Sequence, residues 1–223
     1  MLKLPIGAEP YLLSVEGLGC IRGDRPVFAG LDMALHAGDA LVLSGANGSG
    51  KSSLLRMLAG LLPPAVGAIR WRGADVDKAP EAHAARLHYL GHQNAIKPTL
   101  TVAENLYPWA ALRGGRGEIR EALAAFGLAD LADAPGRLLS SGQTRRLALA
   151  RLLAAPAPLW LLDEPGVGLD RRALGDLGDV IAAHRARGGL VVLATHQDLG
   201  LPDARHLSME AYPPGALVEA LPW

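Results

Sequence analysis

The chain of 223 residues contains one cysteine, Cys20, and has no excess of charge of either sign. A single cysteine cannot form an internal disulfide bond, which is typical of a protein that folds in a reducing compartment. The 22 basic and 22 acidic residues give a formal net charge of +0, so no overall charge attracts the chain to nucleic acid or to an anionic membrane surface. Composition therefore excludes a disulfide scaffold and does not support a nucleic-acid-binding class.

Long apolar runs are also missing. The first ten residues have no apolar core of signal-peptide length, because Glu9 and Pro10 interrupt them, and we expect that the protein is not secreted. The best candidate for a membrane span, 147–162, contains an arginine and two prolines. The sequence predicts no membrane span, so any membrane association has to come through a partner.

A glycine-rich stretch is the first positive signal in the chain. It follows an apolar run of strand length at 40–43 and precedes a helical pattern in which Leu54, Leu58 and Leu61 share one face. Two prolines at 63–64 are expected to end that helix. The stretch fits the phosphate-binding pattern G-x-x-x-x-G-K-[ST]. It consists of Gly45, Ala46, Asn47, Gly48, Ser49, Gly50, Lys51 and Ser52, and Ser53 follows it.

The residue types in this phosphate loop suit a nucleoside triphosphate. Glycines let main-chain N–H groups approach phosphate oxygens, and the following helix presents the positive end of its dipole. Lys51 is expected to reach the β- and γ-phosphates, where it also serves catalysis, and the Ser52 hydroxyl is expected to ligate Mg²⁺. The sequence therefore predicts a site for a nucleotide with Mg²⁺.

The rest of the chain reads as alternating strands and helices, which predicts an α/β fold with an antiparallel β edge. A hairpin over 11–28, turning at residues 23–24, is expected to lead into a separate strand at 31–35. Further strands or hairpins are expected at 67–76, 87–91, 159–162 and 190–194, and helices at 141–155, at 171–185 and around Ile119, Ala122, Leu123 and Phe126. The helical character begins after residue 93, so we place a subdomain boundary there.

Polar residues follow three of the predicted strands, at the carboxyl ends where ligands of α/β folds collect. Asp163 is expected to hold Mg²⁺ together with Ser52, and Glu164 to polarise the attacking water. Gln93 and His196 follow the other two strands. Taken alone, a glutamine at a loop start is usually exposed and a lone histidine is usually structural.

The segment 139–143 allows two interpretations. Ser140, Ser141, Gly142 and Gln143 stand at the start of a predicted helix. They are either a plain N-cap, since serine accepts N–H bonds there, or a second anion site built from a helix N-terminus, a hydroxyl and a glycine backbone. Under the second interpretation, two chains share one nucleotide.

These motifs, in this order and spacing, resemble those of the ATP-binding cassette (ABC) ATPases, over about residues 13–207. The resemblance implies one nucleotide-binding domain over 1–223, with a phosphate-loop ATPase core at 1–93 and 156–223 and a helical subdomain at about 94–155. It implies a head-to-tail homodimer with ATP between one phosphate loop and the partner's signature helix. The implied roles are nucleotide contacts for Ser141, Gly142, Gln143 and Asp170, γ-phosphate sensing for His196, and Mg²⁺ binding plus coupling to a membrane partner for Gln93.

The chain also resembles the CcmA family, the haem-exporter ATPases of bacterial cytochrome c maturation, at residues 89–93, 96–97, 100–101, 104–106, 142–146 and 194–199. That resemblance implies a CcmB-like integral membrane permease subunit, haem-handling membrane proteins and a peripheral place on the cytoplasmic face of the bacterial inner membrane. Haem enters by resemblance alone, since no haem-binding motif is present. The alternatives are the ATPase of another ABC transporter, or a soluble ABC protein acting on nucleic acid or ribosomes, which usually has two cassettes or a long coiled-coil insertion.

Two positions depart from the ABC pattern. Where most members stack an aromatic residue on adenine, this chain has Arg22, and we predict that its guanidinium lies flat on the base. The loop before Asp170 carries Gly166 and Gly168 where hydroxyl or other small residues are commoner, which predicts a loose contact across the dimer. The turn-like tail at 212–223 has no role that the sequence reveals.

Overall fold

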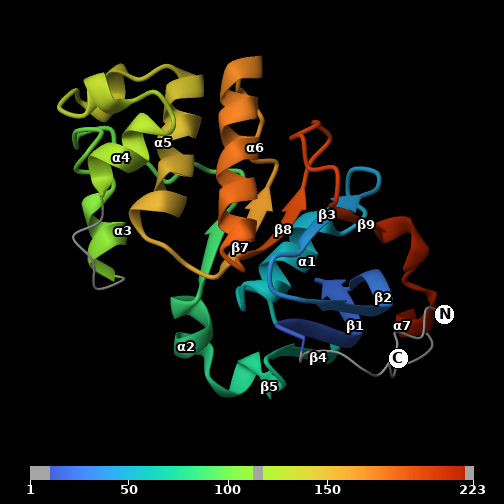
Figure 1. Cartoon of the computed structure of the whole chain (residues 1–223). Coiled ribbons are helices and arrows are strands. Elements are labelled where there is room, and N and C mark those ends of the chain that lie inside the picture. The colour runs from blue at the N-terminus through green and yellow to red at the C-terminus, as the bar shows by residue number, and fades with distance from the viewer. Residues whose placement is uncertain (1–10, 113–117, 219–223) are drawn as a thin grey trace.

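The computed structural model describes residues 11–112 and 118–218, which fold around two β-sheets (Figure 1). The first sheet has the strand order β2-β1-β4-β5, and its strands pair antiparallel. Its members are β1 (Leu13–Arg22), β2 (Arg25–Leu35), β4 (Val66–Trp71) and β5 (Ala74–Asp75). The predicted α/β fold with an antiparallel edge is confirmed.

The hairpin formed by β1 and β2 turns at residues 23–24, as the sequence predicts, but the expectation of a separate strand at 31–35 is wrong. β2 is continuous, and it pairs with β1 from Arg25 opposite Arg22 to Leu35 opposite Leu13. Irregularities in the register absorb the mismatch between the two strands. β1 and β2 therefore form one long hairpin within the four-stranded antiparallel sheet.

The second sheet is parallel, with the order β6-β7-β8-β3-β9. Every residue of β7 and β8 is buried, as expected for central strands covered on both faces. Because all five strands run the same way, their carboxyl ends meet at one edge. The strands are β6 (Leu87–Leu90), β7 (Leu159–Asp163), β8 (Leu190–Ala194), β3 (Ala40–Ser44) and β9 (Arg205–Ser208).

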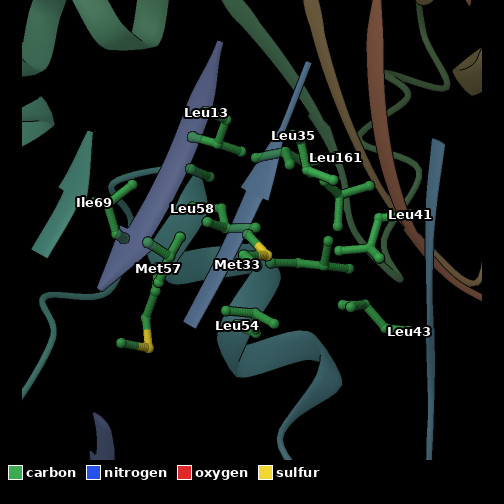
Figure 2. Close-up of a cluster of buried hydrophobic side chains, with 14 of the residues drawn as sticks. Leu13, Met33, Leu35, Leu41, Leu43, Leu54, Met57, Leu58, Ile69 and Leu161 are labelled. Carbon is green, nitrogen blue, oxygen red and sulfur yellow. The ribbon is translucent and has the colours of Figure 1, made fainter. Parts of the chain in front are cut away.

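Helix α1 (Lys51–Leu58) lies between the two sheets, in a hydrophobic cluster to which both contribute (Figures 1 and 2). Figure 2 shows Leu54 and Leu58 of this helix among side chains from both sheets, and both are fully buried. Leu61 was expected on the same face, but it is 63% exposed because the helix ends at Leu58. The prolines at 63–64 do not end it, since a left-handed Gly60 (φ 71) already turns the chain.

A second hydrophobic cluster joins the other face of the parallel sheet to the helices on that side of the molecule (Figure 1). Phe126 packs there although it lies beyond α4, so the expected helix is shorter than its apolar pattern. Besides α1, the helices of the described residues on both sides of the molecule are α2 (Pro80–Ala85), α3 (Tyr107–Leu112), α4 (Ile119–Ala124), α5 (Ser141–Ala154), α6 (Arg171–Ala186) and α7 (Gly215–Val218). The 3-10 turns lie at Val76–Lys78, Ala129–Leu131, Gly136–Leu138 and Met209–Ala211. Among the residues that the structure describes, no helix combines the length and apolar character needed to cross a membrane.

Candidate nucleotide-binding site

The phosphate loop runs from the carboxyl end of β3 into the first turn of α1. Gly50 is the N-cap of that helix and has a left-handed φ of 106. A Cβ there would lie 2.8 Å from Cδ1 of Phe28, so only glycine fits both the angle and the space. No side chain of the described residues caps α1. Its first-turn N–H groups therefore lie where an anion can accept their hydrogen bonds.

The ammonium group of Lys51 folds back over this loop. Nζ donates to the carbonyl oxygens of Gly45 at 2.6 Å and Ala46 at 3.1 Å, and the residue is 8% exposed. The hydroxyl of Ser49 is buried and has no hydrogen-bond partner among the described residues. A buried cation and an orphaned hydroxyl beside uncapped N–H groups are a donor set that suits phosphate oxygens.

Ser52 and Asp163 meet although they are far apart in sequence. Oγ of Ser52 donates to Oδ1 of Asp163 at 3.0 Å. Asp163 is the last residue of β7 and is 6% exposed. A hydroxyl beside a carboxylate at the edge of a phosphate loop fits the oxygen ligands that Mg²⁺ prefers.

Glu164, the residue after Asp163, lies beside His196. Its backbone is left-handed (φ 47), and its N–H donates to the carbonyl of Ala194, at the end of β8, at 2.8 Å. Its Oε1 lies 3.7 Å from Nε2 of His196, and the two side chains are 26% and 60% exposed, respectively. The carboxylate is thus open to water and stands next to an imidazole.

A cavity of about 540 Å³ lies beside these groups. Of the residues that the sequence predicts for the site, Arg22, Asn47, Gly48, Gly50, Lys51, Ser52, Ser53, Asp163 and Glu164 line it. Sequence reasoning missed four others, namely Arg25, Pro26, Val27 and Pro214. The first three follow the hairpin turn directly, and that turn signal, which places Arg25 opposite Arg22, could have found them. Nothing in the sequence pattern pointed to Pro214.

A capping box between Ser140 and Gln143 forms the start of α5. The hydroxyl of Ser140 accepts from the N–H of Gln143 at 3.2 Å, and the Gln143 side chain accepts from the N–H of Ser140 at 2.8 Å. Of the two interpretations of this segment, the N-cap therefore holds for Ser140 and Gln143. Ser141 is exposed, and a Cβ on Gly142 would lie 3.0 Å from the carbonyl oxygen of Gly168. Neither Ser141 nor Gly142 is the cap, so both remain candidates for an anion contact.

The predicted site residues do not all meet in one chain. Within 11–112 and 118–218, the residues that line the cavity do not include Gln93, Asp170 or the 141–143 segment. Gln93 is exposed, and Asp170 caps α6 by accepting from the N–H of Ala173 at 2.8 Å. One chain thus holds the phosphate loop and its carboxylates together and presents the start of α5 elsewhere.

The family of the chain follows from comparison with known proteins. A family model described as ABC transporter matches residues 28–167. The chain belongs to this family. As an ABC transporter ATPase, it binds ATP and hydrolyses it.

Curated relatives of this ABC transporter chain have a more specific name. It is 57% identical to the cytochrome c biogenesis ATP-binding export protein CcmA of Paramagnetospirillum magneticum, over 94% of this chain and 97% of the relative. It is 56% identical to the protein of the same name from Rhodospirillum rubrum, over 92% and 88% of the two chains. A solved structure of a putative ABC transporter ATP-binding protein from Pyrococcus furiosus superposes with a TM-score of 0.79 at 25% identity, covering 90% of this chain and 98% of that one.

Proposed function

We propose that the chain is the ATP-hydrolysing subunit of an ABC exporter in c-type cytochrome biogenesis, where hydrolysis drives the release of haem or a haem–chaperone adduct. The observation that carries the ATPase assignment is the contact of Ser52 with Asp163, which joins the phosphate loop to the end of β7 beside Glu164. The biogenesis assignment rests on the resemblance to proteins named CcmA. The ATPase of a different ABC transporter is the second candidate.

Binding of ATP uses groups that the cavity already collects. The first-turn N–H groups of α1 and the ammonium of Lys51 hold the phosphates, and Lys51 exchanges its loop carbonyls for phosphate oxygens. Ser52 and Asp163 would hold Mg²⁺, which when bound neutralises charge that develops on the phosphates. The guanidinium of Arg22, at the rim of the cavity, lies on the adenine ring.

Hydrolysis requires a water molecule aligned with the terminal phosphate. Glu164 orients or deprotonates that water, because it lines the cavity and its side chain is partly open to solvent. His196 lies within 3.7 Å of the same carboxylate and senses the γ-phosphate. In this arrangement Glu164 and His196 act as a pair at the ends of two neighbouring strands.

A second copy completes the site. Ser141 and Gly142 lie at the start of α5, outside the cavity of their own chain. We place them, together with Gln143 and Asp170, against the nucleotide of a partner subunit in a head-to-tail homodimer. Gln93 contributes to Mg²⁺ binding and couples the site to a CcmB-like membrane permease on the cytoplasmic face of the inner membrane.

The ATPase assignment is tested with the purified chain and Glu164→Gln. We expect steady-state ATP hydrolysis to fall by about 100-fold or more, since a general base contributes this much. The affinity for a fluorescent ATP analogue should stay within about 3-fold of wild type, because the groups that bind the nucleotide are unchanged. Glu81→Gln, at an exposed site on α2, is the matched control and should behave as wild type. Undiminished hydrolysis by Glu164→Gln would sink the assignment.

The exporter assignment needs a cellular test. In a bacterium that lacks its own copy of this gene, the wild-type chain should restore covalent haem in c-type cytochromes, and Glu164→Gln should not. The wild-type chain should also co-purify with an integral membrane protein of the permease class. Normal haem attachment without this chain would favour the ATPase of a different transporter.

A further inference from the structure

Arg145, in the first half of α5, reaches across to the end of β7 and to the loop after β6. It is 5% exposed, and every nitrogen of its guanidinium donates a hydrogen bond. The acceptors lie in two segments of the chain. They are the carbonyl of Pro165 at 3.0 Å, of Gly91 at 3.2 Å, of Asp163 at 3.2 Å and of Glu164 at 2.6 Å, and the side-chain oxygen of Asn94 at 3.0 Å.

The arrangement is matched to a guanidinium. Burial lowers the pKa of Arg145, and the charges of Asp163 and Glu164 act in the opposite direction. A buried charge is tolerated only when its hydrogen-bonding capacity is filled. The planar fork fills it with oxygens of two separate segments, which the single nitrogen of a lysine cannot do.

One of these segments contains Glu164 in an unusual conformation. Its φ of 47 lies in the left-handed region, which non-glycine residues adopt only when their surroundings hold them there. Its N–H is fixed by Ala194, and its carbonyl by Arg145. The backbone of the residue is therefore held on both sides, and Glu164 lines the cavity.

The other segment contains Gln93. Gly91 and Asn94, on either side of that residue, both bond to the guanidinium of Arg145. Ala95 follows with a left-handed φ of 52. A shift of this loop, or of α5, therefore acts on the same side chain that holds the Glu164 carbonyl.

We propose that Arg145 is a positioning residue that sets the place of the Glu164 carboxylate and ties it to the Gln93 loop and to α5. The proposal rests on the proposed role of Glu164 in hydrolysis. The hydrolytic geometry is then assembled only when the loop, the signature helix and the end of β7 are in register.

The first test is Arg145→Lys, which keeps the charge and loses the fork. We expect kcat for ATP to fall by about 10- to 100-fold, the loss that misplacing a catalytic group by about 1 Å produces. KM should change by less than about 3-fold, because the phosphate loop is untouched. Arg146→Lys is the matched control. It lies next along α5, and its guanidinium bonds to the carbonyl of Phe126, so it should stay within about 2-fold of wild type.

A double-mutant cycle separates positioning from a general loss of structure. If Arg145 acts through Glu164, then Arg145→Lys should have less than about a 2-fold effect on the residual hydrolysis of Glu164→Gln, measured in single turnover. An equal fold-loss in both backgrounds would overturn the proposal. If Glu164→Gln itself hydrolyses ATP as wild type does, the proposed function fails, whatever Arg145 does.

Hydrogen exchange gives a readout that does not depend on activity. In Arg145→Lys, amide exchange should accelerate in segments 91–95 and 163–167 and stay unchanged over α6. Acceleration over the whole chain would identify a purely structural arginine, and unchanged exchange at both segments would contradict the positioning role of Arg145.

Discussion

Two helices of this protein, α1 and α5, start beside a serine and a glycine, and they differ in whether a side chain caps the first turn. The start of α1 has a glycine N-cap and no side chain of the described residues as its cap. The start of α5 has a complete capping box between Ser140 and Gln143. Both helices are expected to meet the phosphates of ATP.

This difference in capping indicates a different role for each helix in nucleotide binding. Uncapped N–H groups at α1 have their hydrogen bonds to give, so phosphate binding is the natural completion of that turn. At α5, the capping box already satisfies the N–H groups of Ser140 and Gln143. What α5 offers is the dipole, the exposed hydroxyl of Ser141 and the backbone of Gly142. We therefore propose that the first helix builds the site and that the second helix, from a partner subunit, closes it.

Removing the cationic side chain of Lys51 from the phosphate loop should have the largest effect on ATP hydrolysis. Lys51→Ala should reduce ATP hydrolysis by about 100- to 1,000-fold, because its ammonium stabilises phosphate charge in both ground and transition states. Steady-state phosphate release measures this. Lys78→Ala removes an exposed lysine that pairs with Asp75 and should change the rate little. If Lys51→Ala keeps its rate, the loop is not the phosphate site.

A charge at the start of α5 should act on hydrolysis and spare ATP binding by the single chain. In Gly142→Asp, the added atoms meet the carbonyl of Gly168 and place a carboxylate where a partner's phosphate is expected. We expect a loss of about 100-fold in hydrolysis with unchanged analogue binding. Gly175→Asp, at a glycine of α6 that faces open space, controls for a new charge on a helix. Equal losses in both variants would remove the distinction between the two helix starts.

Acid should weaken the packing of α6 on β7 through His184, which lies on α6. Burial, and less so Arg187, lower its pKa to about 4, and it stacks on Trp160 with ring centroids 3.7 Å apart. Because the folded pKa lies below the unfolded value of about 6.5, stability is full above pH 6.5 and is lost as the pH falls toward 4.

The loss should be on the order of 2 to 3 kcal/mol, measured by urea unfolding across this range. His184→Phe keeps a ring on Trp160 and should flatten the curve. His83 touches the end of α1 by bonding to the carbonyl of Leu58, and burial lowers its pKa as well. If His83→Phe flattens the pH dependence of the unfolding free energy more than His184→Phe does, the acid-sensitive group is instead His83, beside the end of α1.

The smallest expected effect is loss of the cap of α5. Ser140→Ala should lower the free energy of unfolding by about 1 kcal/mol, the usual contribution of such a cap. Hydrolysis should stay within about 3-fold, because the cap is a property of the helix and not a ligand of ATP. Ser141→Ala should show the reverse pattern, with unchanged stability and slower hydrolysis. A strong loss of hydrolysis in Ser140→Ala would show that capping the helix and contacting the nucleotide are not separate roles of Ser140 and Ser141.

Sequence reasoning found the parts of this protein that depend on local chemistry. The phosphate loop is recognised from spacing, because each of its glycines and its Lys51 meets a need of the phosphate itself. Parallel strands such as 159–163 are visible because central strands are apolar throughout.

The place of local turns and the features that depend on tertiary contacts were not visible. Leu61 fits the helical period, yet the chain leaves the helix at Leu58, and a period cannot report where a turn begins. Pro214 lines the cavity from the far end of the sequence. Arg145 stands in a recognisable motif, but its partners come from two distant segments, and only the fold brings them together.

We propose that one chain holds half of an ATP site and that a second copy closes it. The mass of Glu164→Gln in sedimentation equilibrium, with and without ATP and Mg²⁺, tests this most directly. We predict a monomer without nucleotide, a dimer with it, and a monomer again when Gly142→Asp is added. A chain that binds ATP and stays monomeric, or a dimer that Gly142→Asp leaves intact, would contradict an ATP site shared between two copies.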